Sequence, residues 1–555
     1  MEQPNEPGNE VIDPVDAEDN DDEDSPNDDD TDSSSSSLGS SSSDGNSSDE
    51  SSELDVSQTL DLLANNDPDL TSLCMSSIAS FDNVTDWRRI GLDIGRNTNL
   101  ELLTFHHVHD TNVTQEHYEA LFEGLVQNKS IRDIDFLQSN IFRGRVFPPL
   151  TPILERCLQF TIEDCDLGPE GSLLLSNALS TCSTSSLEEI NFDQIDFGDE
   201  VMHVIKALKV HTKLEKISLR GNNIGTSGCL ELLHLFPNRN NNSRLIALDL
   251  GENDITDEGA SILASGLNNE NSITHLNLSN NPIDTKGWQA LANLLGSSRS
   301  RLKSLSIKDN YINDEEHQSL ANSLVNNNTL TDLYLDNTDI TIRGLQAYST
   351  VLQSPRSRLK HLSLRKNRIK NRGAILLANS LVNNNTLLQL NLESDVSITS
   401  KGWKAFSRLL CRRSSIMDTY LSNHILQRLI GDEYTLSGDL MQLLLMNRDG
   451  DRQHVARQKI IKCHFTGENL DMQPFVDMKL GALLHVIAWM GRDGISLLYP
   501  FVRNMQSFFN FSDGVKADNG PAAKRQKVQL QSVAHCPNSY IGEWWHEKHT
   551  IKQFE

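Results

Sequence analysis

The sequence predicts an α/β solenoid, a curved stack of units that each contain one short strand and one helix. Three observations support this prediction. A pattern of leucine, isoleucine and asparagine recurs through residues 100–430, and the intervals between its copies are nearly constant. Within each copy, the spacing of apolar residues changes from two to three and four, which indicates a strand followed by a helix.

The recurring pattern has leucine or isoleucine at its first, fourth and sixth positions, asparagine at its ninth and isoleucine at its eleventh. The complete copies begin at Leu214, Leu245, Ile273, Leu302 and Leu359. Weaker copies begin at Leu100, Ile131, Cys157, Leu187, Leu330, Leu387 and Ile416. The chain therefore contains about twelve units of 26–31 residues, and from Ile273 onward the steps alternate between 29 and 28.

Each unit follows from simple physical chemistry. Alternate strand residues point inward because a strand has a period of two. The asparagine at position nine can hydrogen-bond the backbone of the turn from inside, and Cys165 and Thr338 take this position in two units. The helical part, such as 259–267, has one apolar face. A single unit cannot bury that face, so units must stack, with a parallel sheet on the concave side and helices on the convex side.

The turn after the strand carries a family resemblance. The stretches Asn222-Asn223-Ile224-Gly225-Thr226-Ser227-Gly228 and Asn253-Asp254-Ile255-Thr256-Asp257-Glu258-Gly259 resemble the ribonuclease-inhibitor class of leucine-rich repeats. The resemblance covers about 330 residues and implies a right-handed horseshoe. It says little about function, because that class includes inhibitors, GTPase-activating proteins, immune sensors and adaptors.

Two units depart from this pattern, and we expect both to be distorted. Phe147-Pro148-Pro149 interrupts the second unit, and His317 replaces the glycine at the helix start of the eighth.

The composition divides the rest of the chain into four segments. Residues 1–55 are an acidic, serine-rich tail with almost nothing apolar, which predicts disorder. Residues 56–99 predict a helical N-terminal cap, and residues 431–512 predict a helical C-terminal cap. Residues 513–555 predict a flexible tail. Within the C-terminal cap, 456–465 and 487–493 resemble the C-terminal extension of leucine-rich-repeat proteins of diatoms, which implies no activity.

Most of the net charge of −28 lies in the N-terminal tail. No Lys or Arg precedes Arg88, whereas 25 acidic residues do; the remainder has 49 basic and 52 acidic residues, a net of −3. A nearly neutral body argues against binding to bare nucleic acid, which needs a basic surface. The eight cysteines show no CxxC spacing, which is typical of free thiols in a reducing compartment. The acidic start of the sequence argues against a signal peptide, and no apolar run is long enough to span a membrane, so we expect a cytoplasmic or nuclear protein without membrane contact.

The candidate binding surface is the concave face, which the residues between the strand leucines should line. In this register basic and acidic rows alternate, and adjacent rows lie about 5 Å apart, so their charges can pair. One interpretation is therefore a self-neutralised face, and the other is a mixed-charge docking surface with Tyr334 and Tyr420 as aromatic anchors. The candidate partner-binding residues are Lys216, Arg220, Asp249, Glu252, Lys303, Lys308, Asp332, Tyr334, Asp336, Lys360, Arg365 and Tyr420.

Two short motifs in the tails are candidates for modification and transport. Ser41 and Ser47 each have an acidic residue three positions later, which suits acidophilic kinases. In the C-terminal tail, Pro521, Lys524, Arg525 and Lys527 belong to the only compact basic cluster, which resembles a monopartite nuclear import signal. Alternatives are that this cluster is incidental or meets the acidic N-terminal tail.

Catalytic and metal-binding motifs are missing from the sequence. It has no Walker loop, Rossmann fingerprint, GxSxG or HExxH motif. His106, His107 and His109 invite a metal hypothesis, but Phe105 and Val108 take the core positions there, so exposed histidines are the simpler interpretation. We therefore expect no catalytic site, no metal and no cofactor.

The sequence is best interpreted as a non-enzymatic, monomeric scaffold that binds a protein on its concave face. The alternative is an activator of a Ran-like small GTPase, because that activator resembles this repeat class and carries an acidic tail. The tail is C-terminal there and N-terminal here, and its catalytic residues cannot be matched to this chain, so no catalytic residue is transferred.

Replacing Lys524 and Arg525 with Ala should lower the nuclear fraction of the protein, because an import receptor reads these cations in an acidic groove. Imaging of a fluorescent fusion measures this fraction. Replacing Lys548 and Lys552 with Ala removes the same charge from the same tail and should leave the fraction unchanged. Equal nuclear fractions for the first variant and the unmodified chain would refute the import hypothesis.

Overall fold

A computed structural model describes most of the chain from Val56 to His464. The described ranges are 56–77, 83–106, 114–139, 150–182, 185–195, 197, 200–236, 243–268, 272–393, 398–432 and 436–464. None of the helices in these ranges has the length and apolar character needed to cross a membrane.

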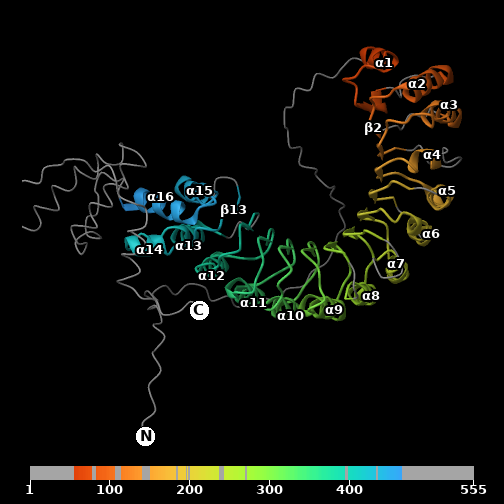
Figure 1. Cartoon of the computed structure of the whole chain (residues 1–555). Coiled ribbons are helices and arrows are strands. Elements are labelled where there is room, and N and C mark those ends of the chain that lie inside the picture. The colour runs from red at the N-terminus through yellow and green to blue at the C-terminus, as the bar shows by residue number, and fades with distance from the viewer. Residues whose placement is uncertain are drawn as a thin grey trace, which may run out of the picture. The chain divides into compact units, whose positions relative to one another are not determined.

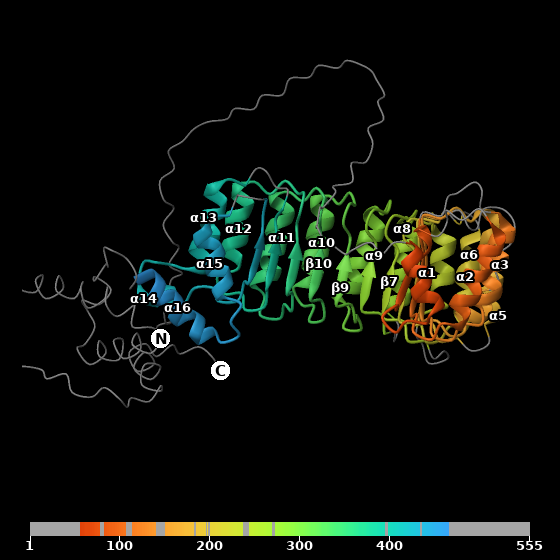
Figure 2. The ribbon, with the colours of Figure 1, turned by 90° about the horizontal axis from the view of Figure 1, so that it is seen from above.

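The described chain forms one curved sheet of thirteen parallel strands, whose order in space is their order in sequence (Figures 1 and 2). Each strand pairs only with its sequence neighbours, so that Leu248 lies between Ile217 and Leu276. The strands are β1 (Ser72–Cys74), β2 (Leu102–His106), β3 (Asp133–Leu137), β4 (Gln159–Glu163), β5 (Glu189–Asp193), β6 (Lys216–Ser218), β7 (Ala247–Asp249), β8 (His275–Asn277), β9 (Ser304–Ser306), β10 (Asp332–Tyr334), β11 (His361–Ser363), β12 (Gln389–Asn391) and β13 (Arg428–Ile430).

Helices follow the strands and form the outer layer of the arc, with the sheet on its inner side (Figure 1). This arrangement confirms the predicted α/β leucine-rich-repeat solenoid. The helices are α1 (Val56–Ala64), α2 (Val84–Arg96), α3 (Gln115–Leu125), α4 (Thr151–Leu154), α5 (Gly168–Thr181), α6 (Val201–Ala207), α7 (Thr226–Leu232), α8 (Asp257–Leu267), α9 (Thr285–Gly296), α10 (Asp314–Leu324), α11 (Ile342–Gln353), α12 (Asn371–Ser380), α13 (Ser400–Leu410), α14 (Ile416–Tyr420), α15 (Gly438–Met446) and α16 (Arg452–His464).

The core lies between the sheet and the helices and continues along the whole arc. The central residue of each short strand is buried, as Leu248, Leu276 and Leu305 illustrate, whereas its two neighbours are more exposed and face the concave side. Burying one such leucine contributes about 1.5–3 kcal/mol. The period of two within each strand therefore separates core residues from surface residues.

A residue with a left-handed backbone conformation lies in the turn that follows most of the strands. At the eighth position of successive units φ lies between +47° and +69°, as at Gln138, Glu252 and Lys366, and only Gly221 among these nine residues is a glycine. Such a φ is uncommon for residues with a side chain. Its recurrence at one position shows that the turn conformation belongs to the repeat and not to one local sequence.

The residue after this turn points inward and bonds the backbone of two units. The Asn253 side-chain oxygen accepts from the N–H groups of Asn222 (3.0 Å) and Ile224 (2.9 Å) in the preceding unit. Its amide nitrogen donates to the carbonyl groups of Leu219 (2.9 Å) and Gly251 (3.0 Å). This asparagine ladder confirms the role predicted for position nine, and it also includes Asn222, Asn281, Asn310 and Asn367.

The two substitutes in the ladder keep part of its bonding. The Cys165 thiol donates to the Glu163 carbonyl group and accepts from the Ser139 N–H, both at 3.3 Å. The Thr338 hydroxyl donates to the carbonyl group of Leu335 at 2.9 Å. Short polar side chains can thus take the asparagine position where a neighbouring unit supplies the remaining bonds.

A second asparagine ladder, absent from the sequence-based prediction, lies where helices return to strands. The Asn327 amide donates to the carbonyl group of Leu295 (2.7 Å), and its oxygen accepts from the N–H of Leu330 (2.8 Å). The same two-way bonding recurs at Asn128 and Asn384. The sequence signal was the repeated Asn-Asn-Asn-Thr linker.

The sheet has one strand more than the units predicted, and its ends differ from the prediction. The segment expected to be a helical N-terminal cap contains β1, which pairs with β2. The copy expected to begin at Ile416 is wrong, because that residue begins α14; the strand of the last unit is β13, after Leu426. A local cap explains the helix, since the Ser415 hydroxyl accepts from the Asp418 N–H at 3.0 Å.

The unit that contains His317 is regular, contrary to our expectation. His317 is 0% exposed, and its ring nitrogens contact the Thr338 carbonyl oxygen (3.1 Å) and the Tyr348 hydroxyl (3.3 Å). A capping box between Asn313 and Glu316 starts α10 at its usual place. For the other departing unit, residues 147–149 lie outside the described residues, and the helix that follows, α4, is short.

Two helices cover the last strand of the arc. Helix α15 packs against α13 and β13, and α16 packs against α14 and α15. Both helices lie where the sequence predicts a C-terminal cap. The remainder of that predicted cap, from 465 to 512, lies outside the described residues, as does 487–493, part of the stretch with the diatom resemblance.

Replacing Asn253 with Ala should lower the free energy of unfolding by about 3 kcal/mol, because two buried N–H and two buried carbonyl groups each lose a partner. Urea unfolding followed by circular dichroism measures the change. Asn322 is exposed on α10, and its replacement with Ala should change stability by less than ~0.5 kcal/mol. Equal effects for the two variants would contradict the structural role of the ladder.

The protein should lose stability between pH 6.5 and pH 4. Burial lowers the pKa of His317 from 6.5 to about 4, so the unfolded chain binds more protons than the folded chain in this range. Stability is therefore present above pH 6.5 and falls as the pH falls, by about 2 kcal/mol at pH 5 for this residue.

Urea unfolding at pH 7 and pH 5 tests this expectation, with His317→Gln as the variant. The variant should lose less stability between the two pH values than the unmodified chain. An identical loss in both would show that His317 does not contribute.

Candidate functional site

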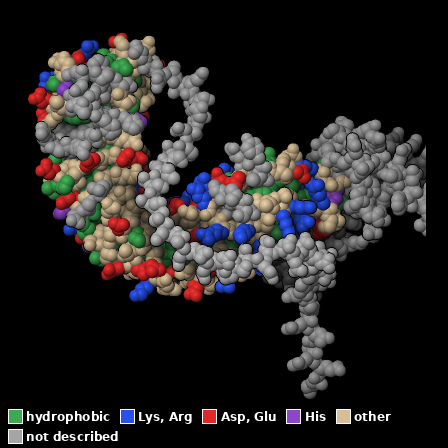
Figure 3. All heavy atoms as spheres, turned by 180° about the vertical axis from the view of Figure 1, so that it is seen from behind, with side chains coloured by type: hydrophobic (Ala, Val, Ile, Leu, Met, Phe, Trp, Pro, Cys, Tyr) green, Lys and Arg blue, Asp and Glu red, His purple; other side chains and the backbone are tan. Residues whose placement is uncertain are grey.

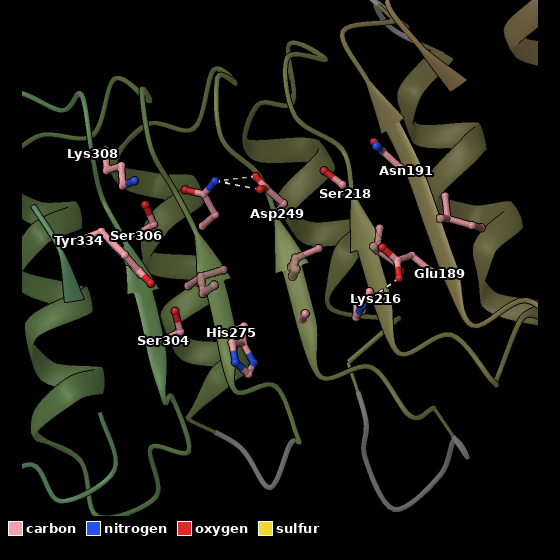
Figure 4. A pocket seen from close by; sticks show the side chains of 16 residues that line it. Glu189, Asn191, Lys216, Ser218, Asp249, His275, Ser304, Ser306, Lys308 and Tyr334 are labelled. Atoms are coloured by element: carbon pink, nitrogen blue, oxygen red, sulfur yellow. Dashed lines mark hydrogen bonds and ion pairs between the residues drawn. The ribbon is translucent and has the colours of Figure 1, made fainter. Parts of the chain in front are cut away.

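The concave face of the sheet is hollowed between β5 and β10 (Figure 4). The hollow has a volume of about 400 Å³. Small side chains, Ala247 on β7 and Ser304 and Ser306 on β9, stand on either side of His275 and Asn277 on β8, and longer side chains stand at the two ends. The hollow therefore follows from residue size at the two exposed positions of each strand.

Polar side chains in the hollow are held by bonds between adjacent strands. The amide of Asn277 donates to both carboxylate oxygens of Asp249 at 2.9 Å (Figure 4). The Ser218 hydroxyl donates to Asp193 at 2.6 Å, and the hydroxyl groups of Ser279 and Ser306 contact each other at 2.8 Å. These side chains are thus ordered before any partner arrives.

Tyr334 forms the aromatic end of the hollow. Lys308 Nζ lies 4.8 Å from the centre of the Tyr334 ring and 3.2 Å from the Asp336 carboxylate. Burial, with Asp332 and Asp336 nearby, raises the pKa of Tyr334. The half-buried ring therefore lines the hollow and has a cation of the protein over one face.

Charged side chains on the concave face pair across adjacent strands, as the alternating rows predict. Lys216 pairs with Glu189 at 2.9 Å, and Arg365 pairs with Glu393 at 3.1 Å. Further pairs of this kind join Arg220 to Glu252, Lys308 to Asp336 and His361 to Asp332. Since such partly exposed pairs contribute only about 0–1 kcal/mol each, a partner can exchange them at little cost.

The predicted site residues are not all equally placed. Lys303 and Lys360 precede β9 and β11 by one residue and are exposed at the edge of the face. Asp336 is buried and accepts from the Ser363 hydroxyl and the Arg365 N–H, so it holds its neighbours in position.

Tyr420 does not lie on the concave sheet, and its predicted place there is wrong. It is 48% exposed at the end of α14, because the cap at Ser415 turns this segment into a helix.

Sequence reasoning missed an acidic patch, which consists of Asp133, Asp135, Glu163, Glu189 and Asp193 on β3–β5. Burial raises the pKa of Asp133, Asp135 and Asp193, and neighbouring carboxylates raise it further. The available signal was the alternation of Asp133 and Asp135 with apolar residues. In Figure 3, acidic side chains are more frequent over the N-terminal units and basic ones over the C-terminal units.

The remaining predicted residues cannot be placed. Ser41, Ser47 and the basic cluster Pro521, Lys524, Arg525 and Lys527 lie outside the described residues, as do His107 and His109. Among the described residues, no three His, Cys, Asp or Glu side chains are grouped so that they could hold a metal ion.

Comparison with known families and proteins finds similarity to repeat proteins. A family model described as "Leucine Rich repeat" matches residues 210–233, 241–264, 270–292 and 358–378. The chain is 27% identical over 273 residues to "NACHT, LRR and PYD domains-containing protein 14" of Mus musculus, over 47% of this chain and 27% of the relative. It is 26% identical to the ribonuclease inhibitor of Mus musculus, over 50% of this chain and 59% of the inhibitor.

The chain thus spans less than two thirds of these two relatives. The ribonuclease inhibitor of Sus scrofa is 24% identical over 57% of this chain and 69% of the inhibitor. Among solved structures, an internalin from Listeria monocytogenes has a TM-score of 0.34 at 17% identity and covers 66% of this chain and 92% of its own. A chain of the yeast Rad7 and Elc1 complex has a TM-score of 0.39 at 16% identity and covers 62% and 84%.

Proposed function

Because this chain is a leucine-rich-repeat protein of the ribonuclease-inhibitor type, we propose that it is a scaffold that binds a protein partner on its concave face. A fold of this kind supports protein–protein interaction in general. The concave sheet offers a continuous surface of thirteen strands, about 55–60 Å along the arc at a strand spacing of ~4.8 Å. This surface is large enough for an interface of ordinary size.

The observation that carries the proposal is the hollow that ends at Tyr334. Interface hot spots are enriched in aromatic and arginine side chains that stand in ordered surroundings. Tyr334 is half-buried and has Lys308 over its ring, and Arg365 lies two residues after Ser363, its partner on the next strand, β11. A side chain of the partner that enters the hollow would therefore meet an ordered aromatic ring at its end, and an arginine that can leave Glu393 lies beyond that end.

The acidic patch on β3–β5 supports an orientation for the partner. Burial and, to a smaller extent, neighbouring carboxylates raise the pKa of these carboxyl groups. A cation that arrives stabilises their charged form and relieves the repulsion between them. We therefore place a cationic region of the partner over β3–β5 and a less charged region over the hollow. Such pairing contributes mainly to association rate and specificity.

We propose binding without a chemical step for this chain. No finding favours the alternative of a small-GTPase activator. We also propose that the protein resides in the cytoplasm, the nucleus or both. Its import into the nucleus would depend on the basic cluster around Lys524.

Replacing Tyr334 and Arg365 together with Ala should reduce partner capture by at least about tenfold, since two central contacts of about 1 kcal/mol or more are removed. The tagged full chain captures proteins from an extract of its own cells, and quantitative mass spectrometry compares the two baits. A partner identified in this way is then purified, and its dissociation constant is measured for both.

The matched control replaces Tyr311 and Arg343 with Ala. Tyr311 is 75% exposed in the turn after β9, and Arg343 is exposed at the start of α11, so both lie off the concave strands. Circular dichroism should show that both variants remain folded. If the concave variant and the control retain the same proteins in the same amounts, the partner does not bind at Tyr334 and Arg365.

A further inference from the structure

Two cysteines meet where the C-terminal helices cover the last unit. Cys411 ends α13, and Cys463 lies near the end of α16, 52 residues later. Their sulfur atoms are 2.6 Å apart as two thiols, and a disulfide bond is about 2.05 Å long. Forming a bond between them therefore requires little movement of either helix.

Positive charge surrounds this pair. Lys459, one helical turn before Cys463, is 0% exposed, and its ammonium group donates to the carbonyl groups of Leu410 (2.8 Å) and Asn423 (2.9 Å). Arg413 lies close by and pairs with Asp439. The hydrogen bond from Cys463 lowers the pKa of Cys411, and both cations lower it further. A thiolate at Cys411 is thus favoured, whereas the hydrogen bond to Cys411 and burial raise the pKa of Cys463, so the remaining proton stays on Cys463.

The other described cysteines lack this chemistry. Burial raises the pKa of Cys157, Cys165, Cys182 and Cys229 to about 11 or 12. Cys74 is exposed, and its thiol contacts the Ser76 hydroxyl at 3.3 Å instead of a second thiol. Within the described part of the chain, only Cys411 and Cys463 form a close pair of thiols.

We propose that Cys411 and Cys463 are a redox modification site that forms a reversible disulfide by reaction with a low-molecular-weight disulfide. Cys463 is partly exposed and Cys411 is buried, so Cys463 is the more accessible of the two to the reagent. Cys463 first passes its proton to the Cys411 thiolate across the 2.6 Å contact and then attacks one sulfur atom of the reagent, whose S–S bond breaks. The first small thiolate leaves and takes the proton from Cys411. The Cys411 thiolate then attacks Cys463 Sγ and displaces the second small thiolate.

The reaction balances without a further reactant. The protein loses two protons and two electrons and gains one S–S bond. The reagent gains both electrons and both protons and becomes two thiols. The reverse reaction with excess small thiol restores the pair.

The bond would fasten the C-terminal helices to the last unit. In the reduced state, α16 is held by its packing, by the bonds of Lys459 and by the contact of His464 with the Thr419 hydroxyl (2.7 Å). A disulfide across the same seam would prevent α16 from separating without unfolding the end of α13. The helices would then leave the edge of the sheet less often.

The test uses the reduced full chain and oxidised glutathione as the probe. Remaining thiols are blocked with N-ethylmaleimide, and tryptic peptides are mapped by mass spectrometry without reduction. The expected product is one peptide pair, 409–412 joined to 463–479, with a loss of two free thiols among the eight. The pair should disappear on addition of dithiothreitol and should be missing from Cys411→Ser and Cys463→Ser.

Cys74→Ser is the matched control, and it should form the pair as the unmodified chain does. Glutathione bound to Cys463 without the joined pair, or thiols that remain free, would overturn the proposal. Amide hydrogen exchange tests the fastening separately. Exchange in α16 should slow on oxidation, and an unchanged rate would overturn that part.

Discussion

The solenoid depends on a buried asparagine that, in most of its regular units, bonds the backbone of two units at once. Asn253 satisfies two N–H groups of the preceding unit and one carbonyl group of each unit. The left-handed backbone conformation of Glu252, the preceding residue, turns the chain so that the Asn253 side chain points inward. Because an unsatisfied buried backbone group costs about 1–3 kcal/mol, a unit that loses this side chain also weakens its neighbour. The regular stacking of the strands follows from this constraint.

The same stacking determines what the concave face can do. Charged residues on adjacent strands are close enough to form ion pairs. They do so between Lys216 and Glu189 and between Arg365 and Glu393. Because each ion pair on this face contributes little free energy, the face loses little stability when a partner replaces these pairs. Specificity must then come from shape, which the hollow and Tyr334 supply, and from the acidic patch, where paired cations are scarce.

The end of the array presents a different problem, because a solenoid edge exposes unpaired strand groups and core side chains. Helix α15 packs against the last strand, and α16 packs against α14 and α15. Their seam contains Lys459, fully buried and bonded to two carbonyl groups, beside the thiols of Cys411 and Cys463. Burial lowers the pKa of Lys459 to about 7, so keeping its charge here costs free energy. A buried amine beside two close thiols is more than two packed helices require, and it fits a chemical role for this seam.

The sequence by itself determined the repeat, because leucine spacing and the asparagine at position nine are local properties that each unit restates. Stacking repeats the same geometry, so strand order, the core and the pairing of charged rows could be predicted. The tertiary structure decided the features that depend on contacts that occur only once and are not part of the repeat. A serine cap turned the segment of Tyr420 into a helix, side-chain size across six strands made the hollow, and the fold brought Cys463 to Cys411 from 52 residues away.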